Sequence, residues 1–327
     1  LAAKGNSPLP GILLSRKTAA LQDTEPPVIR LEYFQEDRKH ISYLDEIFVE
    51  GTIKDNNEVK QLYFNREKIL FRGRKNRFSY IHTLDKGENL IVIRGIDSAG
   101  NESRKTIRVQ YREPAVQRYE SRLSLFIDNF KEKPEDIDLN FDVKEALDSI
   151  MFERRRFRVI TEEEAGGGVP ADCILKGKIR KRKNYMEIFA DLFLQNPDSE
   201  QTLRRLAKVD AHREHESSQE ELIADRELME DMAKEIHLKL SYEIPLTEGN
   251  VIGSDGGQNI VTDLGKETNV KAGMEIIVYR KDSNAMEKDF EELGNARIED
   301  VKENNSKASL RKGDTAVIRE KEHVITR

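Results

Sequence analysis

The sequence predicts a multidomain α+β protein with an N-terminal β-sandwich, a central α/β sheet-and-helix domain and a C-terminal small β-barrel. Three observations support this fold class. Apolar residues alternate with polar ones early in the chain, helical stripes bracket a set of strands in the middle, and short glycine-separated strands follow. The length of 327 residues suits two or three domains. The predicted boundaries are 1–26 for a linker or tail, 27–113 for the sandwich, 114–245 for the central domain and 246–327 for the barrel.

Composition favours several small cores over one large enzyme core, because 35% of the residues are charged, 7% are aromatic and tryptophan is absent. The net charge of -6 is spread along the chain, and basic clusters such as 178–183 are balanced by nearby acids, so no nucleic-acid partner is expected. A single cysteine, Cys173, excludes an intrachain disulfide. No apolar run approaches the ~18 residues that span a bilayer, so no membrane-spanning segment is expected. The chain begins at Leu1 rather than Met, which leaves open whether a signal peptide or lipid anchor precedes it.

The first 113 residues are predicted to form a tail and then an antiparallel sandwich. Residues 1–26 mix Gly, Pro, Ser and Ala, and Pro26-Pro27 favours an extended entry into the first strand. From Val28 the apolar period is two, and turn residues separate the runs. The predicted strands lie near 29–33, 47–53, 62–64, 78–80, 90–92 and 107–111.

Four segments of this region resemble the bacterial immunoglobulin-like modules of surface and periplasmic proteins. They are Pro26-Pro27-Val28-Ile29, residues 49–55, residues 87–92 and the closing Asp97-Ser98-Ala99-Gly100-Asn101. The resemblance implies an immunoglobulin-like sandwich that serves as a spacer or a binding domain.

Two interpretations of Asp55, Asn57 and Asp97 are open. Their oxygens suit a calcium site, but the EF-hand pattern is absent. A hydrogen-bonded turn is favoured, because Gly100 can adopt a positive φ and Asp97 and Asn101 can bond to the turn backbone.

The central domain is predicted to be a mixed sheet with helices packed on it. A helix is expected to start at Asp142, with Glu145 completing a capping box, and a closing helix is expected to start at Ser218 with Glu221. Strands are expected at 125–127, 156–160, 171–179, 186–192 and 203–211.

The opening strand with Phe-Ile-Asp-Asn-Phe, the segment Arg-Phe-Arg-Val-Ile and the segment Ala-Asp-Cys-Ile-Leu-Lys-Gly-Lys-Ile carry a second resemblance. Together they are similar to the periplasmic domain shared by the curli-secretion channel family, the lipoprotein activators of penicillin-binding proteins and flagellar assembly protein T. That resemblance implies an assembly or regulatory role in the bacterial envelope. The long membrane-facing hairpins of the curli channel have no counterpart here, so a pore is not expected.

The last part is predicted to be a small barrel, with strands at 259–262, 275–279, 297–301 and 316–318 and a charged insertion at 281–295. Residues 270–276, residues 296–301 and Gly313-Asp314 resemble the C-terminal domain of flagellar assembly protein T. That family's own N-terminal domain is replaced here by the immunoglobulin-like module.

Side chains that could carry chemistry each have a structural interpretation that is favoured. His212 and His215, with Glu214 and Glu216, lack the second histidine of a zinc-protease helix and are predicted to lie in a solvated loop. Residues 166–168 are three glycines without the Lys-Ser/Thr ending of a phosphate loop, which indicates a flexible connection. Cys173 is predicted to be a buried structural thiol, and Met229 and Met232 to belong to a helix core.

The sequence therefore predicts a non-enzymatic envelope protein with no catalytic, cofactor-binding or metal-binding residues. Its expected role is structural, in a periplasmic machine of the flagellar-ring or secretion type, with periplasmic or outer-membrane-associated localisation. Expected partners are other proteins of the envelope complex, including copies of this chain in a ring, through the edge strands of the sandwich and barrel. The alternative is a module that contacts peptidoglycan or regulates an envelope synthase, and a hydrolase is the weakest prediction.

Overall fold

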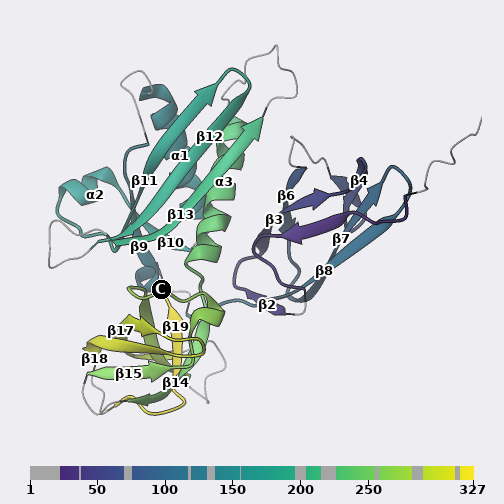
Figure 1. The fold of residues 1–327 in the computed structure, drawn as a ribbon. Helices are drawn as coiled ribbons and strands as arrows, with labels where there is room; N and C mark the ends of the chain where they lie inside the picture. Colours follow the sequence, from purple (N-terminus) through teal and green to yellow (C-terminus); the bar gives the residue numbers. More distant parts are fainter. Residues whose placement is uncertain are drawn as a thin grey trace, which may run out of the picture. The chain divides into compact units, whose positions relative to one another are not determined.

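A computed structural model gives the fold (Figure 1), and it describes residues 23–36, 38–69, 76–116, 119–130, 137–154, 156–195, 204–214, 226–254, 258–281, 290–313 and 317–327. Most of these residues lie in strands. The chain divides into two compact units. Unit 1 comprises 1–30, 51–78 and 92–106, and unit 2 comprises 31–50, 79–91 and 107–327. These two units are discontinuous in sequence, and the predicted domain boundaries at 26/27, 113/114 and 245/246 stay a prediction.

The first eight strands form two sheets, ordered β1-β3-β6 and β2-β8-β7-β4-β5. Within unit 1 the sheets face one another, since a Cβ built at Gly95 of β7 would lie 2.3 Å from Ile53 Cδ1 of β3. One edge pairing, between β2 and β8, is parallel rather than antiparallel, which is possible because a long connection separates the two strands. The strands are β1 (Val28–Leu31), β2 (Lys39–Ser42), β3 (Glu46–Lys54), β4 (Val59–Phe64), β5 (Glu67–Ile69), β6 (Arg77–Thr83), β7 (Gly87–Asp97) and β8 (Glu102–Tyr111).

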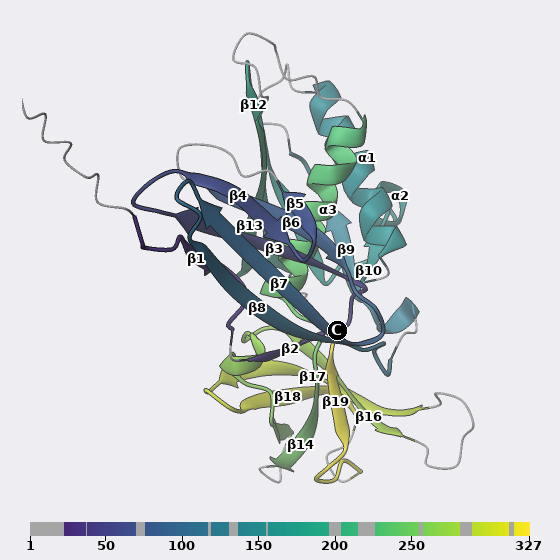
Figure 2. The ribbon, with the colours of Figure 1, turned by 90° about the vertical axis from the view of Figure 1, so that its right-hand side faces the viewer.

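The central part is a mixed sheet in the order β10-β9-β11-β12-β13, and the predicted mixed sheet is present. Strand β9 pairs in parallel with β10 and β11, whereas β11, β12 and β13 are antiparallel neighbours. Helices α1 and α3 cover one face of this sheet (Figures 1 and 2). The elements are β9 (Leu123–Ile127), α1 (Ile137–Glu153), β10 (Phe157–Ile160), α2 (Glu162–Gly166), β11 (Cys173–Arg182), β12 (Tyr185–Leu194), β13 (Arg204–Glu214) and α3 (Arg226–Glu243).

The alternation of β12 explains this arrangement, because every second residue is buried toward the helices and the others lie on the opposite face. The apolar stripe of α1 is buried in the same core. The residues that line this core from β12 and α1 are Met186, Ile188, Ala190, Leu192, Leu194, Val143, Ala146, Leu147, Ile150 and Met151.

The predicted helix starts are the least accurate part. Helix α1 begins at Ile137, so the capping box predicted at Asp142 is wrong. Packing of Leu139 against the core favours the longer helix. Ser218 and Glu221 lie outside the described residues, where α3 is described from Arg226. A capping box does occur at Thr161, which starts the unpredicted helix α2.

The predicted small barrel is confirmed: six strands close in the order β14-β15-β18-β17-β16-β19. Two predictions about it are wrong. A closed barrel has no free edge to pair with a partner, and Val317 and Ile318 lie in no strand. The barrel closes instead through β18, in which Ala308 and Leu310 are the apolar residues, and through the short strand β19, which pairs with β14 and β16. The strands are β14 (Glu248–Ser254), β15 (Asn259–Thr262), β16 (Glu275–Lys281), β17 (Phe290–Val301), β18 (Ser306–Gly313) and β19 (His323–Thr326).

Within unit 2 the central sheet and the barrel share one hydrophobic core. Gly273, before β16 of the barrel, lies close to Leu194 and Leu206 at the ends of β12 and β13, since a Cβ built on it would lie 3.1 and 3.7 Å from their side chains. Arg156, only 4% exposed, donates hydrogen bonds to the carbonyls of Ile244 (3.0 Å) and Arg327 (2.8 Å). These bonds join the start of β10, the chain after α3 and the end of β19.

Candidate functional site

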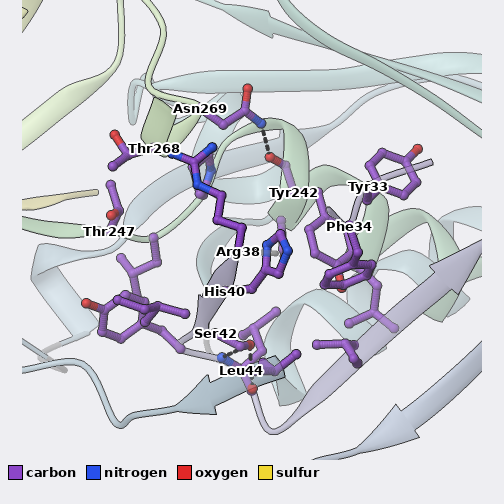
Figure 3. A pocket seen from close by; sticks show the side chains of 18 of the residues that line it. Tyr33, Phe34, Arg38, His40, Ser42, Leu44, Tyr242, Thr247, Thr268 and Asn269 are labelled. Atoms are coloured by element: carbon purple, nitrogen blue, oxygen red, sulfur yellow. Dashed lines mark hydrogen bonds between the residues drawn. The ribbon is translucent and has the colours of Figure 1, made fainter. Parts of the chain in front are cut away.

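A pocket of about 400 Å³ lies in unit 2 beside the last turn of α3 (Figure 3). Its aromatic wall begins with Tyr33 and Tyr242, whose rings stack at a centroid distance of 5.1 Å. Phe34 meets Tyr242 edge-on at 5.4 Å, and the Tyr242 hydroxyl accepts a hydrogen bond from the Phe48 amide (3.2 Å). These contacts attach the segment 31–50 to α3.

The polar groups of the pocket are largely used within its own walls. The Ser42 hydroxyl donates to the Leu44 carbonyl (2.7 Å), the Asn269 amide donates to the Tyr242 carbonyl, and Arg38 pairs with a Glu267 carboxylate at 3.3 Å. Burial lowers the pKa of His40 and, at Tyr33, burial raises the pKa to about 12. Neither ring is charged near neutral pH, and the ring contacts with Tyr242 make the pocket a packing joint between the segment 31–50 and α3.

A buried charge network lies next to this joint. Glu235 on α3 is 3% exposed, and its carboxylate lies 2.5 Å from Arg213 Nη1 and 3.0 Å from Lys239 Nζ. Lys239 also pairs with Glu50 at 3.1 Å. Burial lowers the pKa of Lys239, but the two glutamates outweigh it and the net shift is upward. These charges hold β3 and β13 on the helix, and breaking the network would leave a charge buried without its partner.

The face of the central sheet that lies opposite α1 and α3 has a different character. We call it the open sheet face and define it by the outward residues of β11, β12 and β13. Strand β11 contributes a row of four cations, and each lies directly opposite an outward residue of β12. The pairs are Lys176 with Asp191, Lys178 with Phe189, Arg180 with Glu187 and Arg182 with Tyr185.

Cations cover the aromatic rings of this face. Lys176 Nζ lies 5.0 Å from the Phe193 ring centroid, Arg180 Cζ lies 5.1 Å from that of Phe189, and Arg205 Cζ lies 5.7 Å from that of Phe193. Both rings are half-buried, and α1 and α3 lie on the other face of the sheet. Such contacts are worth about 0.5–1 kcal/mol at exposed sites, so the face is a mixed cationic and aromatic surface in contact with water.

The outer edge of the same sheet is protected. Lys239 Nζ donates to the Asp210 carbonyl of β13 (2.7 Å), Lys271 Nζ to the Leu206 carbonyl (3.4 Å) and Arg213 to the His212 carbonyl (3.0 Å). Cationic side chains on edge carbonyls block the addition of another strand. The sheet can therefore meet a partner through its open face more readily than through β13.

Helix α1 presents the opposite charge. Its solvent side carries Phe141, 65% exposed, and Phe152, 67% exposed. We call this side the acidic helix face, and its other exposed residues include Asp142, Glu145, Asp148 and Glu153.

In unit 1, Asp23, Asp55 and Asp97 each offer a carboxylate oxygen, and these oxygens lie within 4.8 Å of one another. Asp97 is 1% exposed and accepts hydrogen bonds from the Asn101 amide nitrogens (both 2.8 Å), which are the predicted turn bonds. Asp55 Oδ1 accepts from the Asn57 amide (2.8 Å), while its Oδ2 is enclosed without a hydrogen-bond partner. Calcium prefers such oxygen ligands, so these residues could hold a cation in addition to forming turns.

The structure places the other candidates as follows. His212 lies on strand β13 rather than in a loop, with its ring 3.6 Å from Glu187 and 3.3 Å from Glu214. His215 and Glu216 lie outside the described residues. Cys173 is fully buried, and burial raises the pKa of its thiol, so it is an unreactive core residue.

The glycines at 166–168 end helix α2, and Gly168 takes a φ of +86° that a glycine readily adopts. Met229 and Met232 are buried on the core side of α3. Neither position needs a ligand to explain it.

Sequence reasoning missed the two surfaces of opposite charge. The cations of β11 alternate in the segment Lys-Gly-Lys-Ile-Arg-Lys-Arg, which is the signal of a one-sided strand. Their register against Phe189 and Phe193 depends on β12 and is visible only in the folded sheet.

Among the described residues, no helix is long and apolar enough to cross a membrane. No protein-family model and no curated protein matches the chain. It is similar to solved fibronectin(III)-like modules of Clostridium thermocellum CbhA, with 11% identity over 28% of this chain and 50% of that chain and a TM-score of 0.23. It is also similar to a titin M10–obscurin-like 1 Ig complex (12% identity, 28% of this chain, 96% of that chain, TM-score 0.21).

A third similarity is to the Bacteroides ovatus protein SGBP-B of a mixed-linkage glucan utilization locus, solved with a mixed-linkage heptasaccharide. The identity is 7%, over 91% of this chain and 70% of that chain, with a TM-score of 0.21. TM-scores this low do not establish a shared fold.

Proposed function

We propose that this chain is a non-enzymatic component of a bacterial envelope assembly, in which the open sheet face contacts a partner macromolecule. The single observation that carries this proposal is the row of four cations on β11 beside the half-buried rings of β12. Specific interfaces are enriched in aromatic residues and arginine, and oppositely charged partners are steered toward such a surface.

The rest of the molecule fits a scaffold. An immunoglobulin-like module at the N-terminal side, with periplasmic location, would set the spacing of the assembly. The joint at Tyr242 and the network at Glu235 and Lys239 hold the segment 31–50 on the helix layer. A segment fixed in this way suits a structural role, in which the chain holds its partners at set positions.

The same face favours peptidoglycan as a second candidate partner, in which case the chain would be a cell-wall-binding or synthase-regulating module. The half-buried rings of Phe189 and Phe193 can pack on the apolar faces of sugars, and the cations of β11 can pair with the carboxylates of the stem peptides. The two candidates share one surface and differ in what it binds.

A charge-reversal variant tests both candidates. In Lys176→Glu/Lys178→Glu/Arg180→Glu, three of the four cations of β11 are reversed, and the matched control Lys54→Glu/Lys60→Glu/Lys68→Glu reverses three exposed lysines of β3, β4 and β5. We expect the unmodified protein and the control to migrate in envelope extracts at several times 37.7 kDa, and the β11 variant to lose this assembly.

Co-sedimentation with purified cell-wall sacculi distinguishes peptidoglycan binding from binding to a protein partner. Sedimentation that the β11 variant loses and the control retains would assign the face to peptidoglycan. A protein that is monomeric in envelope extracts and does not sediment with sacculi would overturn the proposed function.

A further inference from the structure

We propose that the open sheet face is occupied by the acidic helix face of a second copy of this chain. This inference rests on the proposed function and names its partner. The open sheet face carries Lys176, Lys178, Arg180 and Arg182 on one strand, and the acidic helix face carries Asp142, Glu145, Asp148 and Glu153 on one helix.

The two charged rows have similar lengths. Asp142 and Glu153 are eleven residues apart, which spans about 16 Å along an α-helix. Lys176 and Arg182 are six residues apart, which spans about 20 Å along a strand. A helix laid along β11 can therefore bring its acids within reach of the whole row of cations.

Apolar contacts on both faces match as well. Phe141 and Phe152 are separated by three helical turns, so their side chains lie on the same side of α1. They are 65% and 67% exposed, which is unusual for this residue type on a helix packed in a core. The rings of Phe189 and Phe193, with the aliphatic stems of the lysines above them, offer an apolar surface on the open sheet face.

The layer arrangement also favours a helix as the occupant. Among the described residues, α1 and α3 cover one face of the sheet (Figure 2), and the opposite face carries the half-buried rings of Phe189 and Phe193, on which a further helix can pack. A uniform polyanion fits less well, because Glu187, Asp191 and Asp210 lie on the same face as the cations. A helix with both acids and phenylalanines matches this mixed surface.

The two faces lie on opposite sides of the sheet, so one contact leaves the second face of each copy unused. Such head-to-tail contacts add further copies until a ring closes or a filament grows. The proposed contact therefore predicts an assembly larger than a dimer.

A charge swap in the full chain tests the pairing. Arg180→Glu/Arg182→Glu reverses part of the β11 row, and Glu145→Lys/Asp148→Lys reverses part of the α1 row, with all four side chains exposed. We expect each variant alone to weaken self-association at least tenfold in sedimentation velocity. A mixture of the two should assemble again, since each reversed face meets a complementary face on the other variant. The matched control, Lys54→Glu/Lys60→Glu, should assemble like the unmodified protein.

Unchanged thermal melting of each variant shows that the fold is retained. The pair Glu145→Cys and Arg180→Cys, mixed under oxidising conditions, should give an intermolecular disulfide, and Cys173 is too buried to compete.

The inference would be overturned if either double-reversal variant still assembled alone. It would also be overturned if the mixture of the two variants did not assemble. A purified protein that stays monomeric, yet loses its envelope complex or sacculus binding in the β11 variant, would overturn the inference and leave the proposed function standing. If the β11 variant kept both the envelope complex and sacculus binding, the proposed function itself would be overturned.

Discussion

Helices α1 and α3 pack side by side on the same face of one sheet, but they place their charges in opposite environments. Helix α3 buries Glu235, His237 and Lys239, each no more than 4% exposed. Helix α1 exposes Asp142, Glu145 and Glu153, while partial burial raises the pKa of Asp148. The buried charges of α3 therefore belong to the fold, because they bind β3 and β13 to the helix. The exposed acids of α1 are not used in this packing.

Removing a charge from α3 should have the largest effect on stability. Glu235→Ala leaves Arg213 and Lys239 in a buried network without their shared carboxylate. Breaking a buried pair from one side costs about 3–5 kcal/mol. Because Lys239 keeps Glu50 as a partner and Arg213 is partly exposed, we expect a loss at the lower end, about 3 kcal/mol, in the free energy of unfolding from urea denaturation. A loss below about 1 kcal/mol would mean that water reaches the network and that the contrast between the helices is smaller than the structure indicates.

The second prediction concerns pH and His237, which is fully buried beside Met151. Burial, with smaller contributions from Arg154 and Arg156, lowers the pKa of His237 from 6.5 to about 3. Between these values the unfolded chain binds a proton that the folded chain does not, so stability is lost as the pH falls. The loss is about 1.4 kcal/mol per pH unit, or about 2 kcal/mol from pH 6.5 to 5.

Because other groups titrate in the same range, the measurement is a comparison with His237→Leu. The free energy of unfolding of this variant should fall less steeply between pH 6.5 and 5 than that of the unmodified protein. Equal slopes would show that the folded and unfolded chains protonate His237 over the same pH range, and that burial does not lower its pKa.

The third prediction concerns the joint at the end of α3. Tyr242→Phe keeps the ring that packs on Tyr33 and Phe34 but removes the oxygen that accepts from the Phe48 amide. A buried amide left without a partner costs about 1–2 kcal/mol, so chemical denaturation should show a loss of that size. An unchanged stability would indicate that water replaces the hydroxyl.

The smallest effect is expected on α1. Glu145→Ala removes an exposed carboxylate in the middle of the helix and replaces it with a better helix former. We expect the free energy of unfolding to change by less than about 0.5 kcal/mol. A loss comparable with that of Glu235→Ala would place the acidic helix face in the fold and remove the contrast on which its docking role depends.

Strand positions could be predicted well from the sequence because alternation is local. The pattern at 186–192 lies inside β12 and that at 259–262 is β15. Strand β18 was missed because Ala308 and Leu310 are its only apolar residues, and β19 because its four residues show no alternating pattern. The start of α1 was missed because a capping-box pattern is short and packing decided the boundary.

The candidate site could be predicted only in part. The burial of Cys173 follows from its apolar strand, and the turn bonds of Asp97 follow from the sequence around Gly100. The contacts between Glu50 and Lys239 and between Phe48 and Tyr242 join residues about 190 positions apart, and no local pattern encodes them. The acidic helix face was also missed, because a helical charge pattern does not reveal whether its acids are exposed or buried.

The lysines that donate to the carbonyls of β13 make this edge of the sheet a poor template for a strand from another molecule. A bare edge would let sheets of neighbouring molecules merge by backbone hydrogen bonding, which tolerates almost any sequence and is hard to reverse. With Lys239 and Lys271 on the carbonyls of β13, a partner that approaches this side of the sheet is selected by its side chains and not by its backbone. A contact selected in this way can be specific and reversible.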